Sequence, residues 1–296
     1  MKIARIGTAD GWDFAVSEDG EHWAELQSLG FQAATTADVL ARVDEIRAAA
    51  DAYPRRISDA ELLSPVHRPG KILAIGLNYV DHAKETDAVP PERPVVFAKY
   101  TSSINGPFAD VIIGEPVTAQ ADYEVELAVI IGRRAKSVRA EQAFAHVAGY
   151  AVANDVSARD WQQADSQFSR SKSADTFCPI GPWITTADEI VDVRSLELTS
   201  RVNGESRQRG VVADLIFDIP TLIEYLSATI TLEPGDVILT GTPPGVGFGM
   251  RPRVFLQPGD EVECRIETLG TIRNRFVDGA PARAQESVAQ EVPAAG

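Results

Sequence analysis

The chain has 296 residues, 44% of them hydrophobic, and a formal net charge of −15 at pH 7, which suits one large domain or a catalytic domain with a smaller companion. This acidic balance has no basic cluster to offset it and argues against nucleic acid as a partner, because a phosphate backbone requires positive charge. Neither a run of roughly 20 apolar residues nor the apolar core of a signal peptide is present, so we expect no membrane partner and a cytoplasmic location.

Residues 1–65 predict a small N-terminal α/β module. Two short strand-like pieces, KIARIG and WDFAV, precede a helical stretch in which apolar residues recur at helical spacing from Val39 to Ile46. The stretch 63–70 is rich in Pro and ends in Gly, which is typical of a linker. We therefore expect a domain boundary near residue 65.

Residues 66–278 predict a larger, β-rich domain. Its strand-like segments are KILAIGLN, PVVFAKY, VELAVIIG, GYAVAND, LELTSRVNGESRQ and DVILTG. Asn203-Gly204 stands between two alternating segments and predicts a type I′ hairpin. Helices are expected only at 140–148 and 219–228, too few for alternating β-α-β units, so the fold class is α+β. The final segment, 279–296, lacks an apolar stripe and predicts a disordered tail.

The segment DYEVELAVII places Glu124 and Glu126 at the start of an apolar run. Side chains alternate faces in a strand, so both carboxylates point the same way, with Cα atoms roughly 6.6 Å apart. Two desolvated carboxylates repel unless a cation compensates, and a hard divalent metal would do so. The alternative for an isolated pair is a solvated strand edge.

Asp155 ends the strand GYAVAND and is placed to supply a third metal oxygen, or alternatively to cap the helical segment that follows. Arg159 and Gln162 would then share one helix face at positions i and i+3. They are placed to bind a substrate carboxylate or carbonyl, although a surface position fits them equally well.

His82 and Glu85 also stand at i and i+3, directly after the strand KILAIGL. A carboxylate at that spacing orients an imidazole that acts on water. Lys172 lies among small residues and can present its ammonium to an oxyanion, and Thr242 lies in GTPPGVG, a loop that can place N–H groups and a hydroxyl around an anion. Each residue alone has a plain alternative as a structural or solvated side chain.

Taken in order, GLNYVDHAKE, YEVELAVIIG, NDVSARDWQ, KSADTFCPIGPW and TLEPGDVILTGTPPGVG resemble the fumarylacetoacetate hydrolase family over about residues 70–277. The resemblance implies the mixed β-sandwich or roll of that family, carrying a catalytic domain after the N-terminal module. It also implies a Mg²⁺ or Mn²⁺ ion, with Ca²⁺ as a further candidate, and a homodimer. The implied site residues are Glu124, Glu126 and Asp155 for the metal, His82, Glu85 and Lys172 for catalysis, and Arg159, Gln162 and Thr242 for the substrate.

The resemblance implies a small 2-oxo acid substrate whose enolate the cation stabilises. We favour hydrolysis, in which His82 activates water to cleave the C3–C4 bond of a 2,4-dioxo acid and release pyruvate and a carboxylic acid. The alternatives on the same site are decarboxylation of an oxaloacetate-like acid and isomerisation of an unsaturated 2-oxo diacid. A member that binds metal and acid without turnover is a further alternative, which the complete set of His82, Glu85 and Lys172 disfavours.

Overall fold

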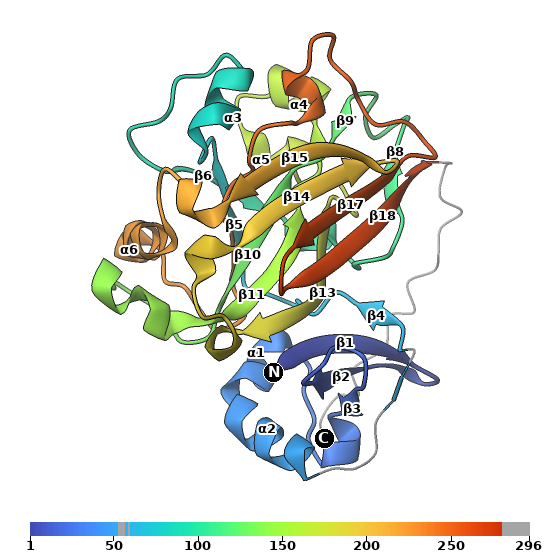
Figure 1. Ribbon diagram of the computed structural model, residues 1–296, viewed down its shortest axis with the longest axis vertical. Helices are drawn as coiled ribbons and strands as arrows, with labels where there is room; N and C mark the ends of the chain where they lie inside the picture. The colour runs from blue at the N-terminus through green and yellow to red at the C-terminus, as the bar shows by residue number, and fades with distance from the viewer. Residues whose placement is uncertain (53–56, 59, 280–296) are drawn as a thin grey trace, which may run out of the picture.

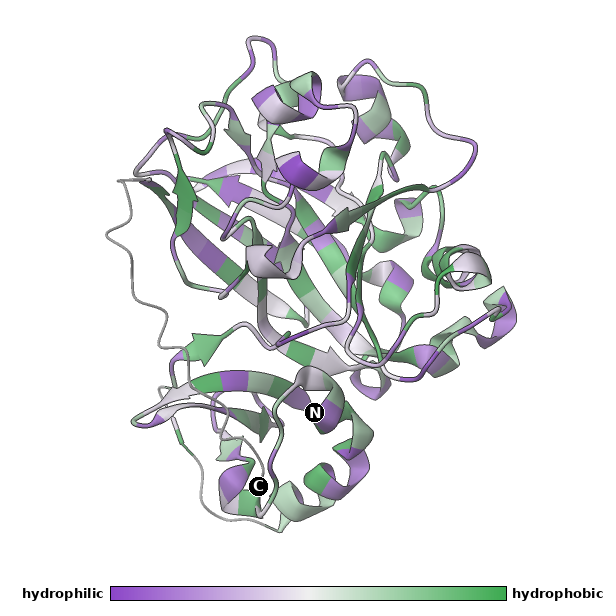
Figure 2. Ribbon diagram, turned by 180° about the vertical axis from the view of Figure 1, so that it is seen from behind, coloured by the Kyte–Doolittle hydropathy of each residue, from purple (hydrophilic) through white to green (hydrophobic). Residues whose placement is uncertain are grey.

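The computed structural model describes residues 1–52, 57–58 and 60–279, so the predicted disordered tail lies outside the described residues except for Gly279. The predicted α+β, β-rich fold is confirmed. Figure 1 shows two packed sheets with helices at their edges, and the N-terminal residues form a smaller body at one end. Seen from behind, hydrophobic stretches run along many of the strands, and the outer helices carry both hydrophobic and hydrophilic residues (Figure 2).

The larger sheet has 11 strands within the described residues and joins the N-terminal residues to the rest of the chain. Its main path runs β3-β2-β1-β13-β11-β10-β16-β5-β6, and β4 and β7 pair at its side. The strands are β1 (Lys2–Thr8), β2 (Gly11–Ser17), β3 (Ala24–Glu25), β4 (Leu62–Leu63), β5 (Ile72–Gly76), β6 (Val95–Lys99), β7 (Ile104–Asn105), β10 (Val125–Ile131), β11 (Val147–Asn154), β13 (Cys178–Thr186) and β16 (Val237–Leu239).

The second sheet packs face to face on β11 and β13 and has the order β15-β14-β17-β18-β8. Its strands are β8 (Val111–Ile113), β14 (Glu197–Val202), β15 (Glu205–Val211), β17 (Glu261–Ile266) and β18 (Gly270–Asp278), and a small separate pair joins β9 (Ala121–Asp122) to β12 (Ser157–Ala158). Asn203 and Gly204 connect β14 to β15 with φ of 52° and 81°. Both values are left-handed, which confirms the predicted hairpin turn.

The α-helices are α1 (Thr36–Ala41), α2 (Val43–Asp51), α3 (Val80–Glu85), α4 (Arg159–Ala164), α5 (Phe168–Ser171) and α6 (Ile219–Thr229). Helix α6 matches the predicted 219–228, and Asp218 caps it by accepting from the Thr221 N–H at 3.0 Å. The predicted helix 140–148 is instead a 3₁₀ segment, Ala140–His146, because β11 begins directly after it and leaves room only for a short connector. Within the described residues, no helix has the length and apolar character to cross a membrane.

Strand β10 is the centre of the packing, since all its residues are buried. On one face, Val125 and Leu127 join the core between the two sheets. On the other face, Ala128 and Ile130 join the core that the N-terminal residues share. Burial on both faces explains the continuous apolar run. Because Glu126 alternates with Val125 and Leu127, its carboxylate is carried into the interior on the Ala128 side.

Acidification is expected to weaken the N-terminal part of the fold through His67. Its ring lies edge-on to Trp12, with centroids 4.6 Å apart, and its Nδ1 contacts the Arg5 guanidinium. Burial, followed by the charges of Arg5 and Arg68, lowers the pKa of His67 from 6.5 to about 4. On acidification, the unfolded chain gains a proton near pH 6.5 that the folded protein accepts only near pH 4. The free energy of unfolding should therefore decrease as the pH is lowered from about 6.5 to about 4, and should level off below pH 4.

His67→Gln removes that proton uptake. The variant should lose less of its melting temperature than the wild type when circular dichroism melts are compared between about pH 7 and pH 4. The difference should be modest because the ring is partly exposed to solvent. Parallel losses in the two proteins would contradict the assignment.

Candidate active site

Three buried carboxylates meet where β10 begins and β11 ends. Residues Glu124, Glu126 and Asp155 are 5%, 2% and 0% exposed, and one oxygen of each lies within 4.8 Å of the others. The antiparallel register causes this convergence, because Val125 pairs with Asn154 and the Asp155 N–H donates to the Glu124 carbonyl at 2.9 Å. The structure thus brings the three predicted metal ligands together.

Two lysines neutralise part of this charge. Lys172 Nζ donates to Glu124 Oε2 at 2.7 Å and to Asp155 Oδ2 at 2.8 Å, and Lys99 Nζ donates to Asp155 Oδ1 at 2.5 Å. Burial raises the pKa of Glu124, but Lys172 and Arg159 outweigh it and hold this pKa below its usual value. The predicted ammonium of Lys172 is therefore in the site, in contact with the carboxylates.

No lysine or arginine forms an ion pair with Glu126 among the described residues. Its Oε2 accepts one hydrogen bond, from the Gly241 N–H at 2.8 Å. Burial, Asp155 and Glu124 raise its pKa well above the usual value. A divalent cation bound to oxygen ligands would offset this repulsion, so the three carboxylates fit a hard metal such as Mg²⁺ or Mn²⁺.

His82 and Glu85 form the predicted i, i+3 pair in α3. The His82 Nδ1 lies 2.7 Å from Glu85 Oε1, and both side chains are largely buried. A neutral ring that donates through Nδ1 keeps Nε2 as a proton acceptor. The second Glu85 oxygen accepts from the Gly245 N–H at 2.8 Å, which fixes the carboxylate that orients the ring.

Arg159 and Gln162 also come together, from the first turn of α4. The buried guanidinium donates to Gln162 Oε1 at 2.8 Å, to Glu124 Oε1 at 2.6 Å and to Asp122 Oδ2 at 2.9 Å. Burial lowers the pKa of this guanidinium, but Asp122 and Glu124 outweigh it and raise the pKa above its usual value. Arg159 is therefore a fixed cation with few remaining N–H groups for a substrate oxygen.

The loop from Gly241 to Phe248 offers its backbone N–H groups to the protein's own carboxylates. The pairs are Gly241 with Glu126 (2.8 Å), Gly245 with Glu85 (2.8 Å), and Gly247 and Phe248 with Asp122 (2.8 and 2.9 Å). Gly241 and Gly245 have φ of 102° and 114°, a region that favours glycine, so the loop depends on these residues. Thr242 lines the cavity, and its hydroxyl donates to the Val125 carbonyl at 2.9 Å.

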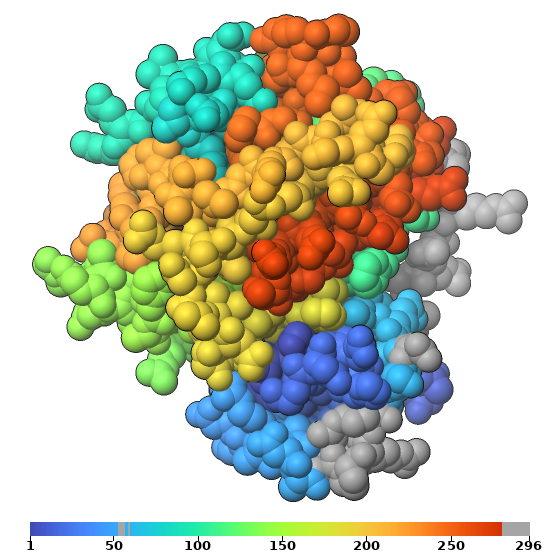
Figure 3. All heavy atoms as spheres, in the orientation of Figure 1, coloured from blue at the N-terminus to red at the C-terminus, as the bar shows by residue number. Residues whose placement is uncertain are grey.

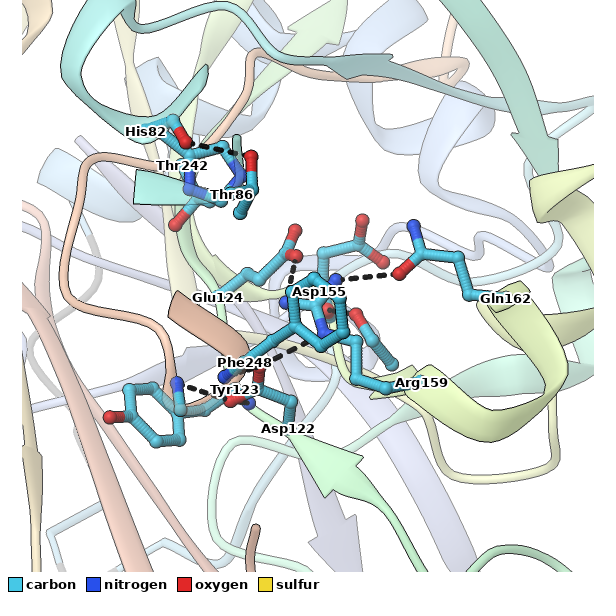
Figure 4. Close-up of polar contacts among 12 residues, drawn as sticks. His82, Thr86, Asp122, Tyr123, Glu124, Asp155, Arg159, Gln162, Thr242 and Phe248 are labelled. Carbon is cyan, nitrogen blue, oxygen red and sulfur yellow. Dashed lines mark hydrogen bonds and ion pairs between the residues drawn. The ribbon is translucent and has the colours of Figure 1, made fainter. Parts of the chain in front are cut away.

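All nine predicted site residues except Glu85 line one cavity of about 210 Å³, and Glu85 stands behind His82. Phe97, Phe168 and Phe248 add apolar rings to the lining of the cavity. Figure 4 shows the Asp122, Glu124 and Arg159 cluster with Gln162 beside it and His82 across the opening. Residues near 80–92 and 245–255 lie next to each other at the end of the molecule away from the N-terminal part (Figure 3).

Sequence reasoning missed several buried residues of the site. Lys99 is 2% exposed and also donates to the carbonyls of Lys172 and Phe177. Asp122 is fully buried and accepts from the backbone of the Gly241–Phe248 loop and from Arg159. The available signal for Lys99 was its position at the end of an apolar strand, and the available signal for Asp122 was its place as a third acid in DYEVE.

Gly249→Ala should slow catalysis while sparing metal binding. A Cβ at this position would lie 2.8 Å from Glu85 Oε2, so the carboxylate must turn away from its present place. The hydrogen bond to His82 would weaken, and loss of such a supporting contact typically costs about 10-fold in activity. Turnover and Mn²⁺ affinity should be measured on the same preparation. An equal loss of both would contradict the expectation that the substitution acts only by displacing the Glu85 carboxylate.

The chain belongs to the fumarylacetoacetate hydrolase family. The family model described as fumarylacetoacetate (FAA) hydrolase C-terminal matches residues 71–277. Human mitochondrial oxaloacetate tautomerase FAHD2A is 49% identical over 222 residues, which cover 74% of this chain and 70% of that protein. The family members that this chain resembles are enzymes named for tautomerase, isomerase and hydrolase reactions.

Two solved structures extend the likeness to nearly the whole chain. Fumarylacetoacetate hydrolase from Exiguobacterium antarcticum is 40% identical with a TM-score of 0.85, covering 94% of this chain and 99% of that one. Maleylpyruvate hydrolase from Sphingobium sp. SYK-6, in complex with manganese(II) and pyruvate, is 32% identical with a TM-score of 0.80, covering 95% and 100%.

Proposed function

We propose that the protein is a divalent-cation-dependent enzyme that transfers a proton at C3 of a small 2-oxo acid, as in keto–enol tautomerisation of an oxaloacetate-like acid. The observation that carries the proposal is an oriented imidazole, His82, in the same cavity as three converging carboxylates. The likeness to a protein named oxaloacetate tautomerase supports this reaction over hydrolysis, which the sequence alone favoured.

Glu124, Glu126 and Asp155 would hold the cation, which would supply positive charge to stabilise the enolate of the substrate. In the enolising direction, His82 Nε2 takes a proton from C3 and passes it, through water, to the oxygen on C2. In the ketonising direction, the proton moves from that oxygen to Nε2 and then to C3. Glu85 stabilises the imidazolium formed in between through its bond to Nδ1. The fixed charge of Lys172 favours the developing oxyanion.

Hydrolysis of an acylpyruvate is the second candidate, because Phe97, Phe168 and Phe248 offer apolar surface to an acyl group beyond C4. In that reaction His82 takes a proton from water, the oxygen adds to C4, the C3–C4 bond breaks and C3 gains a proton. The products are pyruvate and a carboxylic acid. The neighbour that holds manganese and pyruvate supports this candidate.

A product assay separates the reactions. Purified protein with Mg²⁺ or Mn²⁺, with and without chelator, is given enol-oxaloacetate, acetylpyruvate and fumarylpyruvate. Chelator-sensitive loss of the enol's ultraviolet absorbance, while the total amount of enol and keto oxaloacetate stays constant, supports the tautomerase. Pyruvate with a second organic acid supports the hydrolase, and pyruvate with carbon dioxide supports a decarboxylase. Chelator-insensitive turnover contradicts the metal site.

Three further predictions accompany this function. The cation is Mg²⁺ or Mn²⁺, the protein forms a homodimer, and it resides in the cytoplasm. Metal analysis of the purified protein and its mass measured by light scattering test the first two. Apart from a second copy of this chain, the partners that we expect are small organic acids.

A further inference from the structure

Gln208 is a fully buried amide in β15, on the second sheet, and it reaches across to the site. Its Oε1 accepts from the Val125 N–H at 3.0 Å and from Ser200 Oγ at 3.0 Å. Its Nε2 donates to Thr242 Oγ1 at 2.7 Å and to the Pro243 carbonyl at 2.8 Å. Both polar atoms of the side chain therefore have two partners each.

Val125 stands between the two carboxylates Glu124 and Glu126. Its N–H is bound by Gln208, and its carbonyl accepts from Thr242 Oγ1 at 2.9 Å. The three residues thus form a closed ring of hydrogen bonds. The orientation of the peptide groups around Val125 sets where the neighbouring carboxylates point, because strand side chains follow their backbone.

This ring replaces a missing strand partner. Strand β10 pairs with β16 only from Ala128 to Ile130, and the Thr240 N–H still reaches the Leu127 carbonyl at 3.1 Å. Beyond that point, the N–H and carbonyl of Val125 face the same side, and no strand from the described part of the chain pairs with them there. Left unpaired in the interior, each would carry a desolvation cost, and the strand end would be free to shift.

We propose that Gln208 is a positioning residue that fixes Glu124, Glu126 and the loop carrying Thr242 in one arrangement. The position requires a side chain that accepts from Val125 and donates to Thr242 at the same time, which an amide does and a carboxylate does not. The inference rests on the proposed metal site, because its effect is read as affinity for the cation.

The test compares Gln208→Met with Ser200→Ala. Gln208→Met keeps the approximate volume and removes all four side-chain contacts. Ser200→Ala removes the two contacts of the Ser200 hydroxyl with Gln208, one to Oε1 at 3.0 Å and one from the backbone N–H at 3.2 Å, and leaves the side-chain contacts to Val125 and Thr242. Calorimetric titration with Mn²⁺, without substrate, should show affinity weakened by about 10- to 100-fold in Gln208→Met, as for other supporting residues of metal ligands. Ser200→Ala should keep wild-type affinity, whatever its melting temperature.

Wild-type Mn²⁺ affinity in folded Gln208→Met, or equal losses in both variants, would overturn the proposal. If Gln208→Met does not fold, Thr242→Val takes its place, because it breaks the ring at the Thr242 hydroxyl. That variant should lose affinity, and Thr242→Ser should retain it; full affinity in Thr242→Val would overturn the proposal. A wild-type protein that binds no Mn²⁺ would instead refute the metal site itself.

Discussion

Glu126→Gln should abolish Mn²⁺ binding and turnover together. Glu126 is the carboxylate that no side-chain cation contacts among the described residues, so its charge is the one that a bound metal has to satisfy. A metal ion contributes several kcal/mol to such a reaction, and a loss of about 4 kcal/mol corresponds to about 10³-fold in rate. Calorimetric titration with Mn²⁺ and the product assay measure both effects.

The same variant should not lose stability in the absence of metal. The amide keeps an oxygen to accept from the Gly241 N–H, and it removes a charge that Asp155 and Glu124 repel. A melting temperature equal to or above that of the wild type would therefore separate loss of the ligand from misfolding. The exposed Glu141→Gln serves as the matched control, and metal-dependent turnover retained in Glu126→Gln would refute the assignment.

His82→Ala should slow turnover by about 10²- to 10⁴-fold and leave Mn²⁺ affinity unchanged. The size is that of a general acid–base group removed from its reaction. Its imidazole contacts Glu85 and lines the cavity, but it is not one of the three converging ligands. Glu85→Gln should have a smaller effect, because the amide oxygen of the variant can still accept a hydrogen bond from His82 Nδ1.

His22 provides a matched control for that variant. It forms a similar pair, with Nδ1 2.8 Å from Asp19 Oδ2 at a spacing of three residues, but both side chains are about half exposed, in the N-terminal part of the chain. His22→Ala removes an imidazole–carboxylate pair from a surface, so turnover should be unchanged. Unchanged turnover in His82→Ala would remove this residue from the reaction.

Local sequence patterns predicted the parts of the fold that local geometry determines. The turn at Asn203 and Gly204 and helix α6 depend on the residues within them, and both are confirmed. The single helical stretch from Val39 to Ile46 is divided, because Arg42 has non-helical φ and ψ of −126° and 21° between α1 and α2. Helical spacing continues across that break, so the pattern did not reveal it.

In the site, as in the fold, contacts between residues close in sequence could be predicted and contacts between distant residues could not. Contacts at i, i+3, such as His82 with Glu85 and Arg159 with Gln162, follow from helix geometry and could be expected. Lys99 and Gln208 reach the site through strand pairing and sheet packing, which connect residues dozens of positions apart. The neighbours of Gln208 give no indication of its contacts, and the local signal for Lys99 is only its position at the end of an apolar strand.

The loop from Gly241 to Phe248 holds three carboxylates through its main chain. Hydrogen bonds from peptide N–H groups do not depend on which side chains the loop carries, apart from the glycines whose φ values are positive. Side chains such as Phe248 can therefore change the shape of the cavity while the acids behind it stay in place. Such a division lets one scaffold acquire new substrates by exchange of a few lining residues, without rebuilding the charged centre.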